Sequence, residues 1–525
     1  MRKPLLLISS IALLVSCSKE LKQDEAALTQ SAKEKATNSL LAARQESATF
    51  NEIASIQIGG SGAAEISAFD AGTKKLFVVN NSAGNNRIEV LDLTNPASPV
   101  ITGFINVVSY GGFVNSVAVS DGKLAAAIES NTKTNNGRVL VFKTTDYSVL
   151  ANVQVGALPD MVTFSPDGKF ILTANEGEPN DAYSIDPLGT VSIITVENNY
   201  AVTTLDFSSF AARADELKVK GLRIFGKNAS FEQDIEPEYI AVSANSNTAW
   251  VTLQENNAIA KIDLSSKTIT DIFPLGFKDY NAAGNTIDAS DEGGTNNPAL
   301  IPVVDFKSWP VYGMYMPDAI AVLPNNNVPF VFSANEGDQR EYGGFNETVR
   351  IGSSAVALDP TTFPNASLLK QNANLGRLNI TNTLGRTGAN GAYSGLYSFG
   401  ARSFSIWHGL TGELIFDSKD FIDKKAFEMG KYPNGRSDDK GSEPEGITIG
   451  RVGNKNLLFV GLERANAVMI FDVTNPVRPI YLQWLNTGIG PEGVLFVSAD
   501  KSPNGKSLFI ASSETDGFVK IYTTN

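Results

Sequence analysis

Acidic side chains recur at two fixed places in a phrase that the chain repeats. The first place opens a short apolar segment, as in Pro159-Asp160-Met161. The second place ends the next apolar segment, as in Ala174-Asn175-Glu176. If the two segments pair as antiparallel strands of a hairpin, the two places lie side by side. We therefore expect five carboxylate pairs on one face: Asp160 with Glu176, Glu238 with Glu255, Asp318 with Glu336, Glu445 with Glu463, and Glu492 with Glu514.

These pairs predict a cation site. Carboxylates at close range repel one another unless they are protonated or bind a cation. A cluster rich in oxygen and free of cysteine suits Ca²⁺ or Mg²⁺, so calcium is the expected cofactor. Asp338, two residues after Glu336, adds another oxygen donor. In the alternative interpretation, the carboxylates accept backbone N–H groups and pair with arginines such as Arg340 and Arg464, and the sequence leaves both open.

The repeated phrase also predicts the fold. Each copy continues as a strand, a turn such as Ser165-Pro166-Asp167-Gly168, a second strand and a third strand with alternating polarity. Units of four strands over ~40–50 residues are typical of propeller blades. Weaker copies at Ala64-Glu65-Ile66 and Asn115-Ser116-Val117 bring the number of copies to seven. The sequence predicts an all-β fold, a seven-bladed β-propeller over residues 51–525.

Long insertions interrupt the copies, and the last copy lacks a strand. The insertions cover approximately residues 197–234, 264–315 and 343–441, and we expect them to decorate one face, as insertions in repeat proteins usually do. The last copy ends after its third strand, whereas Ile53–Ile58 precedes the first copy as a spare strand. We predict that this spare strand completes the last blade, because ring closure removes exposed sheet edges.

The N-terminus predicts a lipid anchor. Arg2 and Lys3 precede an apolar run that is too short to span a bilayer. The run ends in Leu14-Val15-Ser16-Cys17, which is similar to a bacterial lipobox, so residues 1–17 are expected to be a lipoprotein signal peptide with Cys17 as the lipidated residue. Residues 18–50 are polar and predict a tether. A plain secretory signal and a short helix packed on the propeller rim are the alternatives.

Composition narrows the possible partners and chemistry. Lys and Arg number 43 against 56 Asp and Glu, a net charge of −13, which disfavours nucleic acid as a partner and favours cations. Cys17 is the only cysteine, so internal disulfides are excluded. His408 is the only histidine, which disfavours a dinuclear zinc phosphatase. The sequence has no nucleophile-elbow motif of a Ser-His-Asp hydrolase.

Several phrases resemble the choice-of-anchor I domain family. They are residues 159–164, 174–181, 222–226, 236–241, 274–279, 333–338, 400–407 and 436–441. That family includes mesenchyme-specific cell surface glycoproteins. The resemblance implies an extracellular propeller with a variable membrane anchor. Its animal members are associated with calcium mineral, and some bacterial relatives are labelled alkaline phosphatases.

Two functions are compatible with the sequence. The first is a lipid-anchored outer-membrane propeller, periplasmic or surface-exposed, that binds calcium on its acidic channel face together with a protein, glycan or mineral ligand. The second is a calcium-dependent phosphoesterase similar to alkaline phosphatases. In the second, calcium would act as a Lewis acid, and Arg340, Arg402 or Arg464 would hold the phosphate. We favour the first because the sequence yields no catalytic constellation.

Overall fold

Seven four-stranded antiparallel sheets form the framework of the described residues, which are 47–292, 303–325 and 328–525 of this computed structural model. The predicted signal peptide, Cys17 and nearly all of the predicted tether lie outside these ranges. Among the helices of the described ranges, none has both the length and the apolar character needed to cross a membrane.

Each sheet is a blade whose strands follow one another from the inside outward. Blade 1 comprises β2 (Ala63–Asp70), β3 (Lys75–Asn80), β4 (Arg87–Asp92) and β5 (Val100–Asn106); blade 2 comprises β6 (Val114–Ser120), β7 (Lys123–Ile128), β8 (Asn136–Lys143) and β9 (Val149–Ala157). Blade 3 comprises β10 (Pro159–Phe164), β11 (Phe170–Asn175), β12 (Thr190–Thr195) and β13 (Ala201–Leu205); blade 4 comprises β14 (Pro237–Val242), β15 (Thr248–Leu253), β16 (Ala258–Asp263) and β17 (Thr268–Pro274). Blade 5 comprises β20 (Ile320–Asn325), β21 (Val328–Asn335), β27 (Ser403–His408) and β28 (Leu414–Asp417); blade 6 comprises β29 (Pro444–Val452), β30 (Lys455–Leu462), β31 (Ala467–Asp472) and β32 (Ile480–Asn486). Blade 7 comprises β33 (Pro491–Val497), β34 (Leu508–Ser513), β35 (Phe518–Thr524) and β1 (Phe50–Gln57).

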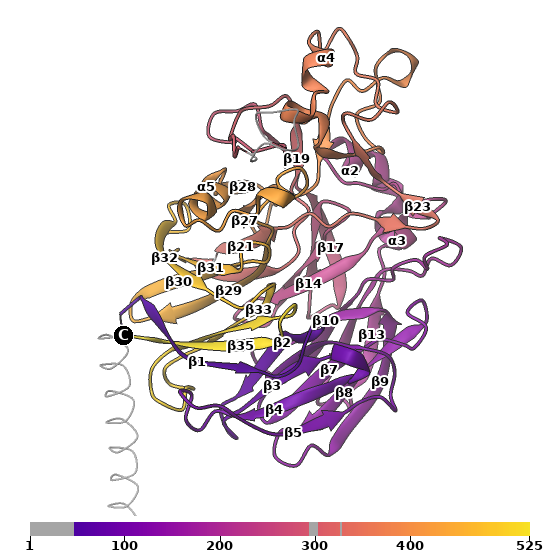
Figure 1. Ribbon diagram of the computed structural model, residues 1–525. Helices are drawn as coiled ribbons and strands as arrows, with labels where there is room; N and C mark the ends of the chain where they lie inside the picture. Colours follow the sequence, from indigo (N-terminus) through magenta and orange to yellow (C-terminus); the bar gives the residue numbers. More distant parts are fainter. Residues whose placement is uncertain (1–46, 293–302, 326–327) are drawn as a thin grey trace, which may run out of the picture.

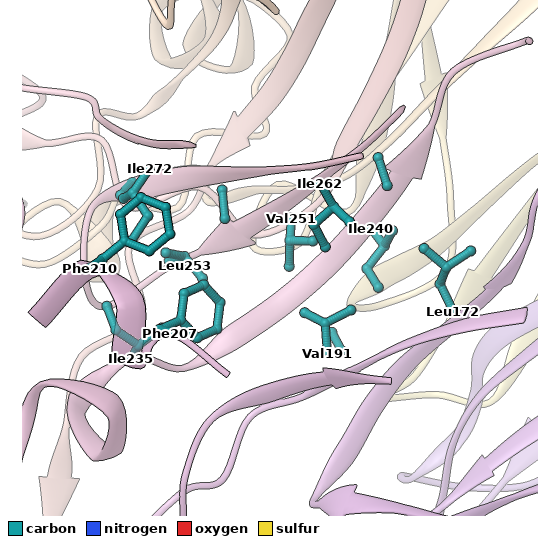
Figure 2. Packing of buried hydrophobic residues seen from close by; sticks show 14 of the residues in the cluster. Leu172, Val191, Phe207, Phe210, Ile235, Ile240, Val251, Leu253, Ile262 and Ile272 are labelled. Carbon is teal, nitrogen blue, oxygen red and sulfur yellow. The ribbon is translucent and has the colours of Figure 1, made fainter. Parts of the chain in front are cut away.

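The innermost strands form a closed ring. Strands β2, β6, β10, β14, β20, β29 and β33 each contact the next in this order, and β33 contacts β2 again. Buried hydrophobic side chains fill the space between neighbouring blades. At the interface of blades 3 and 4, Leu172 and Val191 face Ile240 and Val251 (Figure 2). The predicted β-propeller is confirmed.

Strand β1 closes the ring as predicted. It pairs antiparallel with β35, from Phe50 opposite Thr524 to Gln57 opposite Phe518. Phe50 is buried and stacks edge-on against Phe459 of blade 6, with ring centroids 5.4 Å apart. The first described strand and the last strand thus lie side by side (Figure 1).

The structure corrects the bounds of the three insertions. The outer strands β13 and β17 lie inside the ranges 197–234 and 264–315, so those insertions begin later than predicted. Both strands are partly exposed and alternate only weakly, which hides them in the sequence. The range 343–441 contains β27 and β28, because the insertion separates the second and third strands of blade 5 instead of following the blade.

The insertions gather on one side of the ring and have a core of their own. Their elements β19, α2, α3, β23 and α4 lie together above the blades (Figure 1). Tyr280, Ile287 and Val311 of the second insertion pack against Ile351 and Leu378 of the third. Residues 208–219 and 421–428 are helical. The remaining elements are β18 (Phe277–Asp279), β19 (Tyr312–Met314), β22 (Glu341–Tyr342), β23 (Phe345–Asn346), β24 (Thr348–Arg350), β25 (Asn379–Thr381), β26 (Tyr397–Ser398), η1 (Ser82–Gly84), η2 (Ser208–Arg213), α2 (Ala214–Val219), α3 (Phe231–Asp234), α4 (Ala366–Leu369), η3 (Asn372–Gly376), η4 (Ala389–Gly391), α5 (Phe421–Glu428) and η5 (Asn434–Arg436).

Candidate cation site in the channel

A cavity of about 420 Å³ is lined by the starts of the innermost strands. Its acidic lining residues are Glu65, Asp160, Glu238, Asp318, Glu336, Asp338, Glu445, Glu463, Glu492 and Glu514. An adjoining cavity of about 250 Å³ is lined instead by largely uncharged residues such as Ile66, Met161 and Val494. The negative charge is therefore concentrated at one end of the channel.

Backbone geometry aims the carboxylates inward. Asp160, Glu238, Glu445 and Glu492 are each the second residue of an innermost strand. A register shift follows at each of these positions, and such bulges re-aim side chains. Gly446 follows Glu445, and a Cβ there would lie only 2.2 Å from the backbone oxygen of Glu492, so the acidic strands approach too closely for a larger residue.

Four groups of three carboxylates have ligand oxygens within 4.8 Å of one another. They are Asp160 with Glu176 and Glu238; Asp318 with Glu336 and Glu445; Glu336 with Glu443 and Glu463; and Glu445 with Glu463 and Glu492. Two oxygens bound to one Ca²⁺ at ~2.4 Å are separated by at most ~4.8 Å, so each group has calcium-compatible spacing. The predicted approach of Asp160 to Glu176, Asp318 to Glu336 and Glu445 to Glu463 is confirmed.

Basic groups are distributed unevenly around this ring. Lys440 places its Nζ 2.6 Å from Glu336 Oε1, 3.1 Å from Asp338 and 3.6 Å from Glu443. Arg464 lies 2.6 Å from Glu463 and 3.1 Å from Glu443. Within the described ranges, no lysine, arginine or histidine pairs with the group of Asp160, Glu176 and Glu238.

Burial and mutual repulsion raise the pKa of most of these carboxyls. Burial is the main cause at Asp160, whose pKa rises to about 7, and at Glu463, whose pKa rises to about 8. Burial and the neighbouring Asp160 also raise the pKa of Glu176 well above its ordinary value. Glu443 is the exception: although burial opposes ionisation, Lys440, Arg436 and Arg464 hold its pKa below the usual value.

These pKa shifts predict how the stability of the cation-free protein, measured in the presence of a chelator, depends on pH. Because Asp160 has a pKa of about 7 when folded and about 3.9 when unfolded, the folded state binds more protons between these values. The free energy of unfolding should therefore fall as pH rises from about 4 to about 7, by about 1.4 kcal/mol per pH unit for each such proton. Denaturant melts should show this fall, and Asp160→Asn should flatten it. A rise in stability over this range would contradict the prediction.

Glu255 does not occupy the place predicted for it. In blades 3, 5, 6 and 7 the second carboxylate follows the second strand directly, but β15 ends at Leu253, so Gln254 takes the equivalent position in blade 4. Gln254 lines the cavity and donates to Glu336 Oε2 at 2.8 Å. Glu255, one residue further on, is absent from the cavity lining, and burial raises its pKa to about 8.

Arg340 and Arg402 are fully engaged in the interior and do not line the cavity, which corrects their predicted place beside a bound anion. Arg340 pairs with Asp234 and Glu236. Arg402 donates to the backbone oxygens of Asp288, Ser437 and Asp439. Arg464 alone of the three predicted arginines lines the cavity, where its side chain is exposed.

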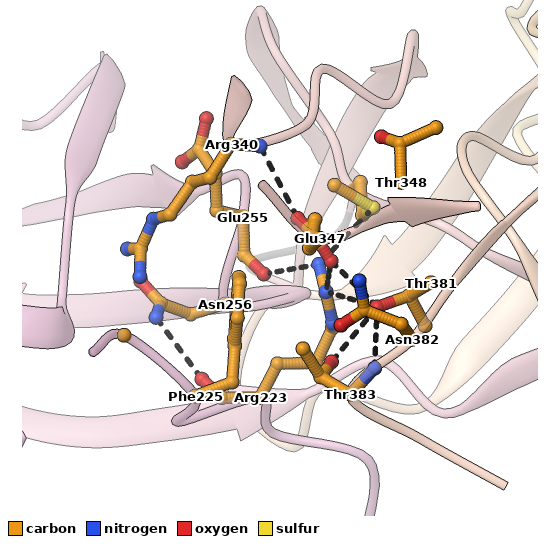
Figure 3. Close-up of polar contacts among 12 residues, drawn as sticks. Arg223, Phe225, Glu255, Asn256, Arg340, Glu347, Thr348, Thr381, Asn382 and Thr383 are labelled. Carbon is orange, nitrogen blue, oxygen red and sulfur yellow. Dashed lines mark hydrogen bonds and ion pairs between the residues drawn. The ribbon is translucent and has the colours of Figure 1, made fainter. Parts of the chain in front are cut away.

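Arg340 belongs to a buried polar cluster that joins the first and third insertions to blade 4. Phe225 lies between two guanidinium groups, with Arg223 at 4.0 Å and Arg340 at 4.6 Å from its ring centroid. Arg223 pairs with Glu347 and donates to the backbone oxygen of Glu255 at 2.9 Å (Figure 3). None of the three carboxylates in this cluster is one of the predicted ring carboxylates. Of the predicted arginines, Arg464 is the one that pairs with a predicted carboxylate, Glu463, at 2.6 Å.

Lys440, Glu236 and Glu443 are site residues that were not predicted from the sequence. A signal for the two glutamates was present, since the triplet Glu-Pro-Glu occurs as Glu236-Pro237-Glu238 and as Glu443-Pro444-Glu445. In both triplets the first glutamate is buried beside arginine, and the second faces the cavity. No comparable pattern marks Lys440, because it lies between blades 5 and 6 outside the repeated phrase.

The fold and the site define an extended β-propeller with an acidic channel mouth. Residues 65–476 match the family model of the choice-of-anchor I domain. The chain belongs to this family, and the resemblance noted in the sequence is confirmed.

Two curated proteins are similar to the chain. Gigasin-3a of Magallana gigas is 23% identical over 188 residues, which cover 29% of this chain and 66% of that protein. The mesenchyme-specific cell surface glycoprotein of Strongylocentrotus purpuratus is 28% identical over 345 residues, which cover 56% of this chain and 43% of that protein. The chain thus spans less than two thirds of the length of these relatives.

Three solved structures have folds similar to that of this chain at low sequence identity. Hydrazine synthase of Kuenenia stuttgartiensis has a TM-score of 0.47 at 12% identity and covers 89% of this chain and 96% of its own. The Cps50 (Swd1) β-propeller domain of Myceliophteria thermophila has a TM-score of 0.45 at 9% identity, covering 91% and 100%. The WD40 domain of Toxoplasma gondii coronin has a TM-score of 0.46 at 8% identity, covering 90% and 86%.

Proposed function

We propose that this protein is a cell-surface binding module whose channel mouth holds a divalent cation, calcium by preference. The observation that carries the proposal is the group of Asp160, Glu176 and Glu238, which has calcium-compatible spacing and no basic partner in the described part of the chain. Uncompensated carboxylates at this spacing repel one another, and a cation relieves the repulsion.

The available donor atoms fit calcium. All of the ligands are carboxylate or amide oxygens, which suit a hard cation, and the described cavity lining includes neither histidine nor cysteine. Further oxygens lie close by without a hydrogen-bond partner: Oε1 of Glu236 and Oε2 of Glu255 are both buried and unbonded. The charges of Glu255 and Glu236 both raise the pKa of Glu176, so the two residues add to the negative charge around this group.

A binding role is better supported than a calcium-dependent phosphoesterase activity. Phosphoryl transfer needs charge stabilisation by arginines, lysines or metal ions at the transferred group. Two of the three arginines predicted for that task, Arg340 and Arg402, are bonded to carboxylates and backbone oxygens away from the cavity. Of the three arginines predicted for a phosphoesterase, only Arg464 therefore remains beside the cavity.

The surface location and the lipid anchor are part of the proposal. One relative is named a mesenchyme-specific cell surface glycoprotein, and the lipobox-like residues ending at Cys17 support attachment to the outer membrane. The cation would complete a surface that takes a protein, glycan or mineral ligand. Labelling of intact cells with radioactive palmitate, lost in Cys17→Ala, tests the anchor.

Thermal unfolding tests the cation site. A soluble fragment that starts at Ser18 should melt several degrees higher in millimolar calcium than in chelator, because a ligand at ~100 times its Kd adds about 2.7 kcal/mol. Asp160→Asn and Glu238→Gln should lose this increase. Glu197→Gln, an exposed carboxylate in the β12–β13 turn, should keep it. No increase in the parent fragment would reject the proposal.

A further inference from the structure

Lys440 lies at blades 5 and 6, next to the blades that hold the proposed cation. Its side chain is 4% exposed, and its Nζ contacts Glu336, Asp338 and Glu443. Gln254 donates to the second oxygen of Glu336, so both oxygens of that carboxylate are bonded. An ammonium group therefore occupies the space between carboxylates whose spacing would otherwise suit a metal ion.

The segment that carries Lys440 is fixed on both sides. Arg402 donates to the backbone oxygens of Ser437 at 2.7 Å and Asp439 at 2.9 Å. On the other side, the backbone N–H of Ser442 donates to Asp423 at 3.1 Å. The residues between them are buried. Lys440 is thus held in place before any ligand arrives, which lowers the entropy cost of keeping its charge at this position.

Arg464 supplies a positive charge to a further group of carboxylates. It contacts Glu463, which belongs to the group of Glu445, Glu463 and Glu492. Glu463 also belongs to the group of Glu336, Glu443 and Glu463. Three of the four carboxylate groups therefore contain a residue paired with Lys440 or Arg464. The fourth, at blades 3 and 4, has no such charge among the described residues. Glu236 and Glu255, each with a buried unbonded oxygen, add negative charge that acts on Glu176.

We infer that Lys440 is a built-in cation that takes the place of a second divalent ion in the blade 5–blade 6 half of the ring, and that it confines calcium to Asp160, Glu176 and Glu238. The inference rests on the proposed function for the site at blades 3 and 4. It adds that the chain itself determines how many ions bind and where. Removing the ammonium group should therefore create a second site instead of merely weakening the first.

Counting bound calcium tests this inference. Equilibrium dialysis of the fragment that starts at Ser18 should give one ion per chain for the parent and two for Lys440→Gln. Lys440→Arg keeps the charge and should stay at one. Lys424→Gln is a matched control, because this half-exposed lysine of α5 pairs only with Asp420 among the described ion pairs. An unchanged count in a folded Lys440→Gln chain would overturn the inference.

A second variant covers the case in which Lys440→Gln does not fold. Glu336→Gln removes the main partner of Lys440 and should leave one bound ion, whereas Asp160→Asn should leave none. Loss of calcium in Glu336→Gln would place the ion in the half that holds Lys440 and overturn the inference. A parent chain that binds no calcium rejects the proposed function separately, and in that case a gain of one ion in Lys440→Gln would still support Lys440 as the built-in cation.

Discussion

A chain that begins at Ile58 should lose cooperative folding, whereas one that begins at Ser47 should melt like the fragment that starts at Ser18. The first truncation removes β1 and leaves β35 as an unpaired edge in blade 7. It also removes Phe50, which is 1% exposed, and the two hydrogen bonds that Gln483 makes with the backbone N–H and oxygen of Phe50 at 2.8 and 2.7 Å. These contacts tie the first strand to blade 6 as well as to blade 7.

A point substitution tests the same ring closure while keeping strand β1 in the chain. Phe50→Ala should lower the free energy of unfolding by about 3–5 kcal/mol, the usual cost of removing a buried phenylalanine. Phe113→Ala is the matched control, since Phe113 is 48% exposed and should change stability little. Urea melts measure both. Equal melting curves for the Ile58 and Ser47 chains would show that β1 does not hold the ring together.

The sequence predicted β1 because a repeat can be counted. The last copy of the repeat lacks one strand, and a spare strand precedes the first copy. Both facts are explained if the spare strand completes the last blade, and the antiparallel pairing of Phe50 with Thr524 shows that it does. The inner hairpins were predictable for a similar reason, because the acidic residues mark the ends of buried apolar strands. The outer strands β13 and β17 were not, since partly exposed strands carry no strict alternation.

The distribution of positive charge in the site could not be predicted. Hairpin pairing brings Asp160 to Glu176 through local geometry, but Lys440 and Glu336 are about 100 positions apart and meet only because the segment between blades 5 and 6 packs beside the end of β21. Likewise, Arg340 comes from the loop after β21 and meets Asp234 and Glu236, which are more than 100 positions earlier in the chain. Such contacts depend on tertiary packing that no local pattern encodes.

Arg340→Met should be the most destabilising single substitution among the polar residues around the channel. The guanidinium pairs with Asp234 and contacts Glu236 Oε2 at 2.8 Å, and all three side chains are at most 3% exposed. Removing it leaves two buried carboxylates without their counter-charge, which typically costs 3–5 kcal/mol, so we expect a loss of about that size. Denaturant melts in chelator measure it. Arg213→Met, which breaks an exposed pair with Glu216, should change the melts little.

The compensating variant separates charge from packing. If the loss comes from unpaired charge, Asp234→Asn and Glu236→Gln added to Arg340→Met should recover much of it, because neutral groups are less costly to bury than ions. Recovery should be incomplete, since Asp234 also accepts the backbone N–H groups of Phe225 at 2.8 Å and Gly226 at 2.6 Å. A triple variant as unstable as Arg340→Met would mean that the guanidinium acts by packing against Phe225.

Calcium should also reduce the loss of stability in Arg340→Met. The freed charge of Glu236 acts on Glu176 and adds to the attraction for the ion.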